Sequence, residues 1–554
     1  MHIFGTLYAC VSCALAARVV VDWSIGYISV NRDGYNLRRA IGVNGVLPIP
    51  PIEATIGDTL EINVYNGLDK STSLHAHGLF QTNTTHMDGP AMINQCGIPP
   101  GESFTYTYYL EQTGTFWIHG HDKHEISDGL RGALVIHDRE QPPFEYDDEY
   151  LLTFEDWFRE EFAEREMITL DPNHSFPPPH GYAFGLINGV NGNITQSMRF
   201  EKGKSYRIRL VNMGDLNWFQ FSLPGHSMEV IEIDGEYTEP HVVDGIDIAP
   251  AQRYSVLVHA HDTDEFNYRF NATIHAEFIP PKQGLTPRVY TGHIVYKQGA
   301  PFKDVGNPYE SSGFKWLDDI ELHALDEQPA LEPTRQIYLD LGNNLYNTGQ
   351  RLDHINNSTF KPPKVPILYT ALSMGELAMD PRIYGPQSNA MVLQQGEVVE
   401  VVLNSFNAMP HPIHIHSRSF QVIEYGPAES LFAPPAEFQN MTVRSYTGAP
   451  PRRDTITVPS FSYAKIRFTG KVAVSLMHCH LSIHMAMGMA AVFVESPDML
   501  QETLDVPEEM FAMCRRQGIP TRGNAAGNPG YDFTGLPNPP SVVERPNAGF
   551  PQNH

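Results

Sequence analysis

The chain is poor in basic side chains, and this deficit limits the partners it can have. It carries 38 Lys and Arg residues against 64 Asp and Glu residues, which gives a formal net charge of -26 at pH 7 and an isoelectric point near 5.3. A surface of this sign repels polyanions and attracts cations. The composition therefore argues against nucleic acid or an anionic membrane as a partner.

Long apolar runs are absent after the first sixteen residues. Residues 3–16 are mostly apolar and end in Ala14-Leu15-Ala16, a pattern typical of signal-peptide cleavage, although no Lys or Arg precedes the run. A membrane anchor is disfavoured because a spanning helix needs about 20 apolar residues. We therefore expect a signal peptide at residues 1–16 and a secreted or cell-wall protein without a membrane span. Seven Asn-x-Ser/Thr sequons are typical of a secreted glycoprotein, and they start at Asn83, Asn173, Asn193, Asn271, Asn356, Asn357 and Asn440.

The length and the strand-like runs predict several β-rich domains. A chain of 554 residues exceeds what one hydrophobic core usually supports. It has 44 glycines and 44 prolines, and runs rich in Val, Ile, Thr and Tyr at residues 61–65, 206–211 and 398–403 predict short strands joined by turns. We therefore expect an all-β fold class.

An internal repeat also indicates domain copies. A turn glycine precedes a β-like run of similar pattern at Gly57, Gly203 and Gly396, and these positions are 146 and 193 residues apart. Repeats of this length are copies of whole domains and not the units of a solenoid.

Cysteine is scarce, and one of the five cysteines lies in a metal-binding pattern. His478-Cys479-His480 is followed by His484 and Met489. A thiolate with a histidine five positions on and a thioether ten positions on can supply the Cys, one His and the weak axial Met of a blue-copper site. The second histidine of such a site must come from elsewhere in the chain.

Histidine pairs occur in three other segments, at residues 75–77, 119–121 and 411–416. Two side chains two positions apart on a strand point to the same face, so that each pair can present both imidazoles to one cluster. Cys479 points away from His478 and His480. Its thiolate can therefore bind one copper while the two imidazoles bind others, which gives an electron a short covalent path between the sites.

A single His-x-His pair is more often exposed or part of a core than bound to a metal. Four clusters with complementary ligands outweigh that interpretation, because ten histidines, one cysteine and one methionine are too many ligands for one ion. Histidines outside the clusters are interpreted as structural, namely His86, His124, His226 and His241.

In their order and separation the four motifs resemble those of the multicopper oxidases, the family of laccases, ascorbate oxidases and fungal ferroxidases, from about residue 20 to residue 500. The resemblance implies four copper ions: one of type 1, one of type 2 and a type 3 pair. The type 1 copper would take His411, Cys479 and His484, with Met489 axial. The type 2 copper would take His75 and His414. One type 3 copper would take His77, His119 and His480, and the other would take His121, His416 and His478.

The resemblance also implies three cupredoxin-like Greek-key β-sandwich domains. The first, at residues 17–140, would hold cluster ligands. The second, at 141–300, would bind no copper. The third, at 336–500, would hold the type 1 copper and further cluster ligands, so that the cluster lies between the first and third domains. Residues 301–335 would form a linker and residues 501–554 a tail, which is rich in Pro, Gly and Asn from Arg516 onward and is expected to be extended or partly disordered.

The family reaction is the four-electron reduction of dioxygen to water, with electrons entering at the type 1 site and passing through Cys479. Asp88 matches an acidic position that the family uses for proton supply. Many relatives have another acidic residue between the last two histidines of the Cys motif, and this chain has Ser482 there. Dioxygen reduction is therefore expected to be slower, or another group to substitute.

Cys96 and Cys514 remain when Cys479 is assigned to copper and Cys10 and Cys13 to the signal peptide. An even pair in an oxidising compartment can form a disulfide, and laccase-like chains tie the first domain to the segment after the third in this way. The alternative is two free buried thiols.

The substrate is the least determined part of the prediction. The first domain resembles those of yeast-type ferroxidases, but the expected acidic iron ligands are replaced by Asn407 and, in the middle domain, by Ile279. Asp215 lies within one residue of the carboxylate that accepts the phenolic proton in laccases, although a turn-capping role explains it equally well. We therefore predict a laccase-like oxidase of phenols, with fungal pigment or polyketide phenol coupling as its candidate role.

Two alternatives stay open: a soluble ferroxidase that oxidises Fe(II), and a copper-binding protein with little turnover. The predicted partners are a phenolic small molecule and dioxygen. The chain is expected to be a monomer, and the sequence leaves open a helper protein that controls coupling.

Overall fold

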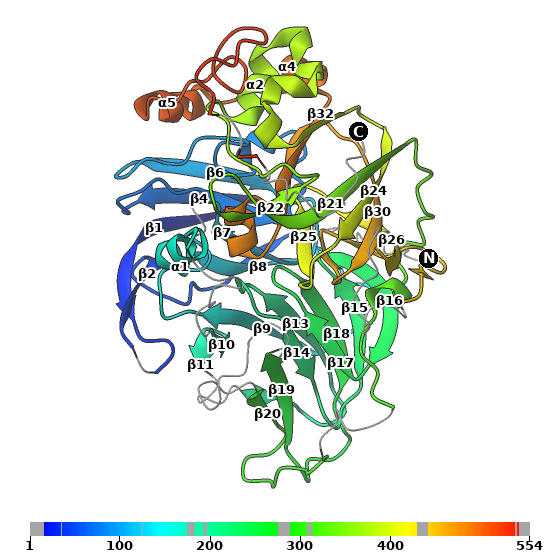
Figure 1. Cartoon of the computed structure of the whole chain (residues 1–554). Coiled ribbons are helices and arrows are strands. Elements are labelled where there is room, and N and C mark those ends of the chain that lie inside the picture. Colours follow the sequence, from blue (N-terminus) through cyan, green and yellow to red (C-terminus); the bar gives the residue numbers. More distant parts are fainter. Residues whose placement is uncertain are drawn as a thin grey trace, which may run out of the picture.

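The computed structural model describes residues 16–34, 36–122, 125–173, 183–191, 197–274, 289–306, 313–428, 441–537 and 540–541 (Figure 1). Strands hold 43% of the described residues and helices 12%, so the predicted all-β class is confirmed. The signal peptide predicted at residues 1–16 lies almost wholly outside the described residues, as do His124, Asn193, Ile279 and Asn440.

The first two sheets come from residues 18–137. Their strand orders are β2-β1-β4-β6 and β3-β8-β7-β5. Their strands are β1 (Arg18–Val30), β2 (Arg38–Val43), β3 (Ile52–Thr55), β4 (Thr59–Asn66), β5 (Leu74–His77), β6 (Ser103–Tyr109), β7 (Gly114–Gly120) and β8 (Arg131–His137).

The next two sheets come from residues 148–295, in the orders β11-β10-β9-β13-β18-β15-β16 and β12-β20-β19-β14-β17. Their strands are β9 (Asp148–Trp157), β10 (Phe184–Ile187), β11 (Val190–Asn191), β12 (Ser197–Arg199), β13 (Ser205–Asn212), β14 (Phe219–Ser222), β15 (Met228–Ile233), β16 (Glu236–Val243), β17 (Gly245–Ile248), β18 (Arg253–His259), β19 (Tyr268–Ile274) and β20 (Val289–Val295).

The last two sheets come from residues 335–495, in the orders β22-β21-β24-β30-β26-β27, with β28 beside β26, and β23-β32-β31-β25-β29. Their strands are β21 (Arg335–Leu345), β22 (Arg351–Ile355), β23 (Ala390–Leu393), β24 (Val398–Ser405), β25 (His411–Ile415), β26 (Phe420–Pro427), β27 (Arg444–Ser445), β28 (Arg452–Arg453), β29 (Thr455–Val458), β30 (Ser462–Thr469), β31 (Ala473–Cys479) and β32 (Ala490–Glu495).

Each pair of sheets encloses its own apolar core. The first core contains Ile62 and Ile118, the second Val256 and Phe270, and the third Ile466 and Phe493, with all of these side chains at most 2% exposed. Alternating apolar residues on facing sheets produce this sandwich packing. The exact domain boundaries stay predictions.

The predicted repeat has a structural basis. The three predicted runs lie in β4, β13 and β24, and each of these strands pairs in parallel with the first long strand of its sandwich and antiparallel with a later one. The glycines that precede them have φ values of 86°, 72° and 78°, which only glycine adopts without strain. The same turn thus opens the same strand in all three sandwiches.

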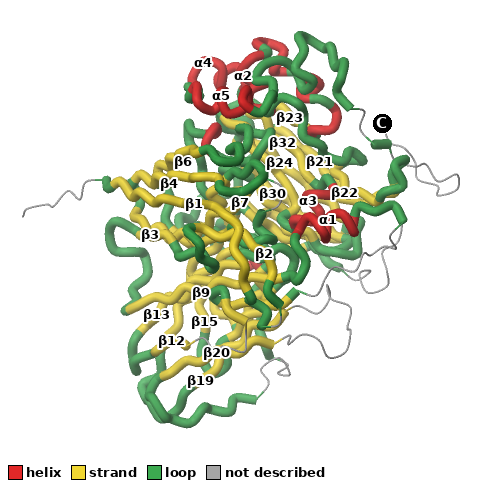
Figure 2. The backbone as a smooth tube through the Cα atoms, turned by 90° about the vertical axis from the view of Figure 1, so that its left-hand side faces the viewer, coloured by secondary structure: helices red, strands yellow, loops and turns green. Residues whose placement is uncertain are grey.

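Helices are few, and the largest group of them lies at one end of the molecule (Figure 2). There, α2 (Ile367–Ser373), α4 (Pro497–Thr503) and α5 (Glu508–Arg516) lie together, with η5 (Gly375–Met379), η6 (Pro381–Tyr384) and η7 (Pro386–Ser388) in the same chain region. The other described helices are α1 (Phe162–Thr169), α3 (Ser482–Met487), η1 (Thr85–Met87) and η4 (Asp319–Glu321). None of the helices in the described ranges is long and apolar enough to cross a membrane.

The segment after the third sandwich packs back onto the first one. In α5, Met510 and Met513 are fully buried in the core of the first sandwich, and Cys514 forms a disulfide with Cys96. This is the pairing that the family resemblance implied. The predicted tail therefore contains an anchored helix before the part without regular structure.

The disulfide closes a loop across most of the chain, because its cysteines are 418 positions apart in the sequence. Replacing both Cys96 and Cys514 with serine should lower the free energy of unfolding by about 2–4 kcal/mol, because the unfolded chain is no longer constrained. Chemical denaturation of the double variant and the wild type measures this difference. Equal stability would show that the helix holds the tail without the bond.

Candidate copper centres

Three ligand atoms converge where β25 begins and β31 ends. The Cys479 Sγ lies 3.7 Å from His411 Nδ1 and 3.6 Å from His484 Nδ1, and the two Nδ1 atoms are 3.1 Å apart. Pairing of β25 with β31 places Ile413 opposite Cys479, while the helix α3 brings His484 back to the thiol. One thiolate and two imidazoles at these distances can hold a single soft metal ion.

A reversal of the chain at the end of α3 brings Met489 next to Cys479 and His484. Gly488 ends α3 with a φ of 109°, and a Cβ there would lie 2.2 Å from a Thr359 side-chain carbon, so only glycine fits. The Met489 N–H donates to the His484 carbonyl at 3.0 Å, and its own carbonyl accepts from the Cys479 N–H at 3.1 Å. The buried Met489 backbone therefore joins both ligand segments.

Burial keeps this site uncharged in the absence of a cation. It raises the pKa of the Cys479 thiol well above its ordinary value and lowers the pKa of His411 to about 3. A neutral imidazole has a lone pair free for a metal, and a bound cation favours the thiolate. The chemistry of the donor set therefore fits a metal ion.

The other eight histidines form a second group between the first and third sandwiches. Pairing of β5 with β7 places His75 opposite His119, and pairing of β25 with β31 places His414 opposite His478. Rings from the two sandwiches then meet face to face, at 3.9 Å for His75 with His416 and 3.7 Å for His77 with His414. The eight are His75, His77, His119, His121, His414, His416, His478 and His480.

Several ring nitrogens of this group are buried without a hydrogen-bond partner among the described residues. They are His75 Nε2, His77 Nδ1, His119 Nε2, His414 Nε2 and both nitrogens of His480. An unpaired buried polar atom is unfavourable unless something binds it. Subsets of three whose ligand atoms lie within 4.8 Å of one another include His121, His416 and His478. This arrangement fits several metal ions.

The electrostatics of the group keep the imidazoles neutral. The pKa values of His119, His121, His416 and His480 lie well below the ordinary value. Burial is the main cause, and repulsion between neighbouring imidazoles adds to it. The lone pairs therefore stay available at neutral pH.

Asp88 orients two of the imidazole rings by hydrogen bonds. Its Oδ2 accepts from His416 Nδ1 at 2.9 Å, and its backbone carbonyl accepts from His75 Nδ1 at 2.8 Å. Asp88 is fully buried after the short helix η1. Because each ring is bound at Nδ1, its Nε2 is left for the metal.

Asp454 does the same for two other rings, and sequence reasoning missed it. Its Oδ1 lies 3.1 Å from His77 Nε2, and its carbonyl accepts from His414 Nδ1 at 2.9 Å. Burial opposes ionisation of Asp454, but a two-pronged ion pair with Arg253, at 2.8 and 2.6 Å, and the nearby His77 hold its pKa well below the ordinary value. No local motif marks this residue, because His77 is 377 positions away.

Asp215 does not lie where a phenol could reach it. It is 1% exposed, its Oδ2 accepts from the Arg165 guanidinium at 2.7 Å, and its Oδ1 accepts from the Ser482 N–H at 3.2 Å. Burial opposes ionisation, but Arg165 holds the pKa of Asp215 below its ordinary value. Both oxygens are occupied, so the predicted role as a phenol base is not supported. Asp215 instead brings a carboxylate to Ser482, where many relatives have an acidic side chain.

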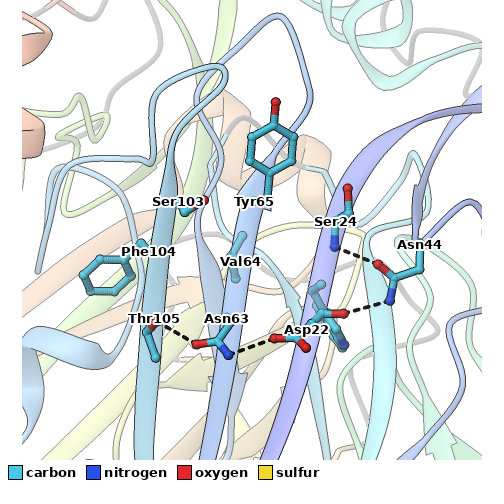
Figure 3. A pocket seen from close by; sticks show the side chains of 10 residues that line it. Asp22, Ser24, Asn44, Asn63, Val64, Tyr65, Ser103, Phe104 and Thr105 are labelled. Atoms are coloured by element: carbon cyan, nitrogen blue, oxygen red, sulfur yellow. Dashed lines mark hydrogen bonds between the residues drawn. The ribbon is translucent and has the colours of Figure 1, made fainter.

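One surface hollow shares no residue with the eight-histidine group or with the type 1 ligands. It lies on β1, β4 and β6, where the Thr105 hydroxyl donates to Asn63 at 2.8 Å and the Asn63 amide donates to Asp22 at 2.8 Å (Figure 3). None of the side chains that line it has a buried polar atom without a hydrogen-bond partner, so the hollow offers no such group to a ligand.

Sequence profiles described as multicopper oxidase match residues 24–141, 148–293 and 360–499. The chain belongs to the multicopper oxidase family. It is 36% identical to the iron transport multicopper oxidase fetC of Epichloe festucae over 559 residues, which cover 99% of this chain and 88% of that protein. It is 34% identical to the iron transport multicopper oxidase fio1 of Schizosaccharomyces pombe, with 98% of this chain and 86% of that protein covered.

The solved structures that match this chain belong to the same family. The crystal structure of Fet3p, described as a multicopper oxidase that functions in iron import, matches with a TM-score of 0.86 and 30% identity, over 95% of this chain and all of that chain. The laccase from Botrytis aclada matches with a TM-score of 0.73 and 25% identity, over 91% of each chain. This multicopper oxidase is thus an enzyme that uses dioxygen as electron acceptor and four copper ions as cofactors, as predicted.

The predicted phenol oxidase function is wrong. The relatives named above are iron transport oxidases, and Fet3p matches more closely than the laccase does. The prediction gave too much weight to two positions. Ile279 lies outside the described residues, and Asn407 places its side-chain amide 3.0 Å from His411 Nε2. The predicted role in fungal pigment or polyketide coupling depended on a phenol substrate and is therefore not supported. The monomeric state and a helper protein stay predictions.

Proposed function

We propose that this multicopper oxidase oxidises ferrous iron and passes the electrons to dioxygen. The observation that carries the proposal is the match along nearly the whole chain to proteins named iron transport multicopper oxidases. The net charge of -26 agrees with a cationic substrate, because a negative surface raises the local concentration of cations.

The proposal includes the copper ligands. The type 1 copper would be held by His411, Cys479, His484 and Met489, and the type 2 copper by His75 and His414. One type 3 copper would be held by His77, His119 and His480, and the other by His121, His416 and His478. The convergence of the Cys479, His411 and His484 ligand atoms supports the type 1 set, and the second type 3 set, His121, His416 and His478, is one of the close subsets. Other subsets combine ligands of different coppers, such as His75 with His77 and His119.

The chain itself supplies a covalent electron path between the type 1 site and the eight-histidine group. Cys479 lies between His478 and His480, and both neighbours belong to the eight-histidine group. Bound copper would supply the redox chemistry, by exchange of single electrons with iron and with dioxygen. Asp88 is well placed to deliver protons there, since its carboxylate contacts His416 and is fully buried.

Secretion is part of the proposal. The apolar segment at residues 3–16, the sequons and a disulfide that needs an oxidising compartment support it.

A paired assay tests the substrate. Catalytic efficiency with Fe(II) should exceed that with a panel of phenols and naphthols by at least about tenfold, equivalent to about 1.4 kcal/mol of transition-state stabilisation. Iron oxidation is measured by loss of Fe(II), corrected for autoxidation, and phenol oxidation by absorbance.

Asn407→Asp is the informative variant for this assay. It places a carboxylate beside His411, so it should lower the KM for Fe(II) and leave the KM for phenols unchanged. Higher efficiency with phenols in the wild type, or no effect of the variant on iron, would contradict the proposal.

A further inference from the structure

A buried carboxylate reaches the type 1 ligands from the third sandwich. Asp353 lies on β22, the edge strand beside β21, and β22 packs against the helix α3 that carries His484. The side chain of Asp353 is nearly inaccessible, with 3% of the residue exposed. Its Oδ2 lies 3.9 Å from His484 Nδ1, the same nitrogen that faces Cys479 and His411.

The two oxygens of Asp353 have different surroundings. Oδ1 accepts from the Asn343 side-chain amide at 2.7 Å, whereas Oδ2 is buried and has no hydrogen-bond partner in the part of the chain that the structure describes. Among the described residues no Arg or Lys forms an ion pair with Asp353, and its one ionic neighbour is His484. A buried carboxylate oxygen without a donor is strongly unfavourable unless a cation lies nearby.

A copper ion bound by the type 1 ligands would be that cation. A metal ion held by His484 Nδ1 at the usual distance of about 2 Å lies within about 6 Å of Asp353 Oδ2, whichever way the ion is displaced. Asp353, His411, Cys479 and His484 are all buried, so a negative charge at this distance is little screened by solvent. It stabilises doubly charged copper more than singly charged copper.

We propose that Asp353 is a positioning residue of the type 1 copper, whose unpaired carboxylate oxygen faces the ion and lowers its reduction potential. The residue adds to the axial Met489, since groups around a copper tune its potential as its ligands do. A lower potential suits a strong reductant such as ferrous iron and leaves less driving force with phenols. The inference rests on the proposed type 1 ligands and does not depend on the substrate.

The test compares Asp353→Asn with a matched control, Asp340→Asn. The first variant keeps the shape of the side chain and the acceptor for Asn343 but removes the charge. The control removes one carboxylate from an exposed position on the neighbouring strand β21, where Asp340 accepts from Asn404 at 3.0 Å. The reduction potential is measured by titrating the blue absorption of the copper-loaded enzyme, and the copper signal by electron paramagnetic resonance.

In Asp353→Asn the potential should shift upward and the resonance parameters of the type 1 copper should change, while the control stays at the wild-type values. A wild-type potential and spectrum in Asp353→Asn would overturn the proposal. If that variant does not load copper, a crystal structure of the copper-loaded wild type decides: Oδ2 should face the ion, and an Oδ2 turned toward another donor would overturn the proposal. A wild-type enzyme without a blue band would instead refute the type 1 ligand assignment.

Discussion

Replacing Cys479 with serine is expected to remove the blue colour of the enzyme and to lower oxidase activity by at least about a hundredfold, or about 2.7 kcal/mol of transition-state stabilisation. Cys479 is the only free cysteine among the described residues, and its Sγ lies within 3.7 Å of both Nδ1 atoms. A serine oxygen cannot form the copper–thiolate bond that gives the colour and the electron path. Activity with Fe(II), visible absorbance and copper content together measure the effect.

The double variant Cys96→Ser with Cys514→Ser is the matched control, since it removes two sulfurs that do not contact the histidines. It should keep the colour. Copper content in Cys479→Ser should fall from four ions to three, because the eight-histidine group is untouched. A serine variant that stays blue would contradict the ligand assignment.

Replacing Asp454 with alanine is expected to lower the free energy of unfolding by about 3–5 kcal/mol, the usual effect of leaving one member of a buried ion pair without its partner. Arg253 is fully buried and donates to both Asp454 oxygens. The same substitution frees His77 from its carboxylate, so copper binding between the sandwiches should weaken by about 10–100-fold. Chemical denaturation and metal analysis at graded chelator concentrations measure the two effects.

Asp326→Ala is the control for this prediction. Asp326 also pairs with an arginine, Arg452, but its side chain is 42% exposed, and such pairs contribute at most about 1 kcal/mol. Equal losses of stability in the two variants would show that burial does not determine the importance of Asp454.

Much of the copper site could be predicted because the decisive pattern is local. In a strand, His75 and His77 must share a face, and so must His414 and His416, so the sequence reveals which rings act together. Asp454 could not be found this way. It meets His77 only because β29 and β5 come from sandwiches at opposite ends of the chain, and no spacing encodes that contact.

The C-terminal helix could have been found and was not. Glu508 and Glu509 open α5, Arg515 and Arg516 close it, and the buried Met510 and Met513 are three positions apart. This charge order suits the helix dipole, and the apolar spacing suits one buried face. The Pro- and Gly-rich composition that follows the helix indicated an extended tail for the whole segment.

The substrate was predicted wrongly for a different reason. Copper ligands are shared by oxidases of iron and of phenols, so selectivity depends on residues around the type 1 histidines. The prediction treated Asn407 as the loss of an iron ligand and Asp215 as a base, yet Asp215 is bound to Arg165 and Ser482 in the interior. Similarity over the whole chain carries more information here than two single positions.

The most direct test of a copper-dependent iron oxidase is the stoichiometry of oxygen uptake with Fe(II). An oxygen electrode, with Fe(II) followed in the same vessel, should record four Fe(II) consumed for each dioxygen, with no hydrogen peroxide released and no enzyme-dependent uptake in Cys479→Ser. Uptake at two Fe(II) per dioxygen with peroxide as the product, or iron oxidation no faster than autoxidation while a phenol is consumed, would contradict it.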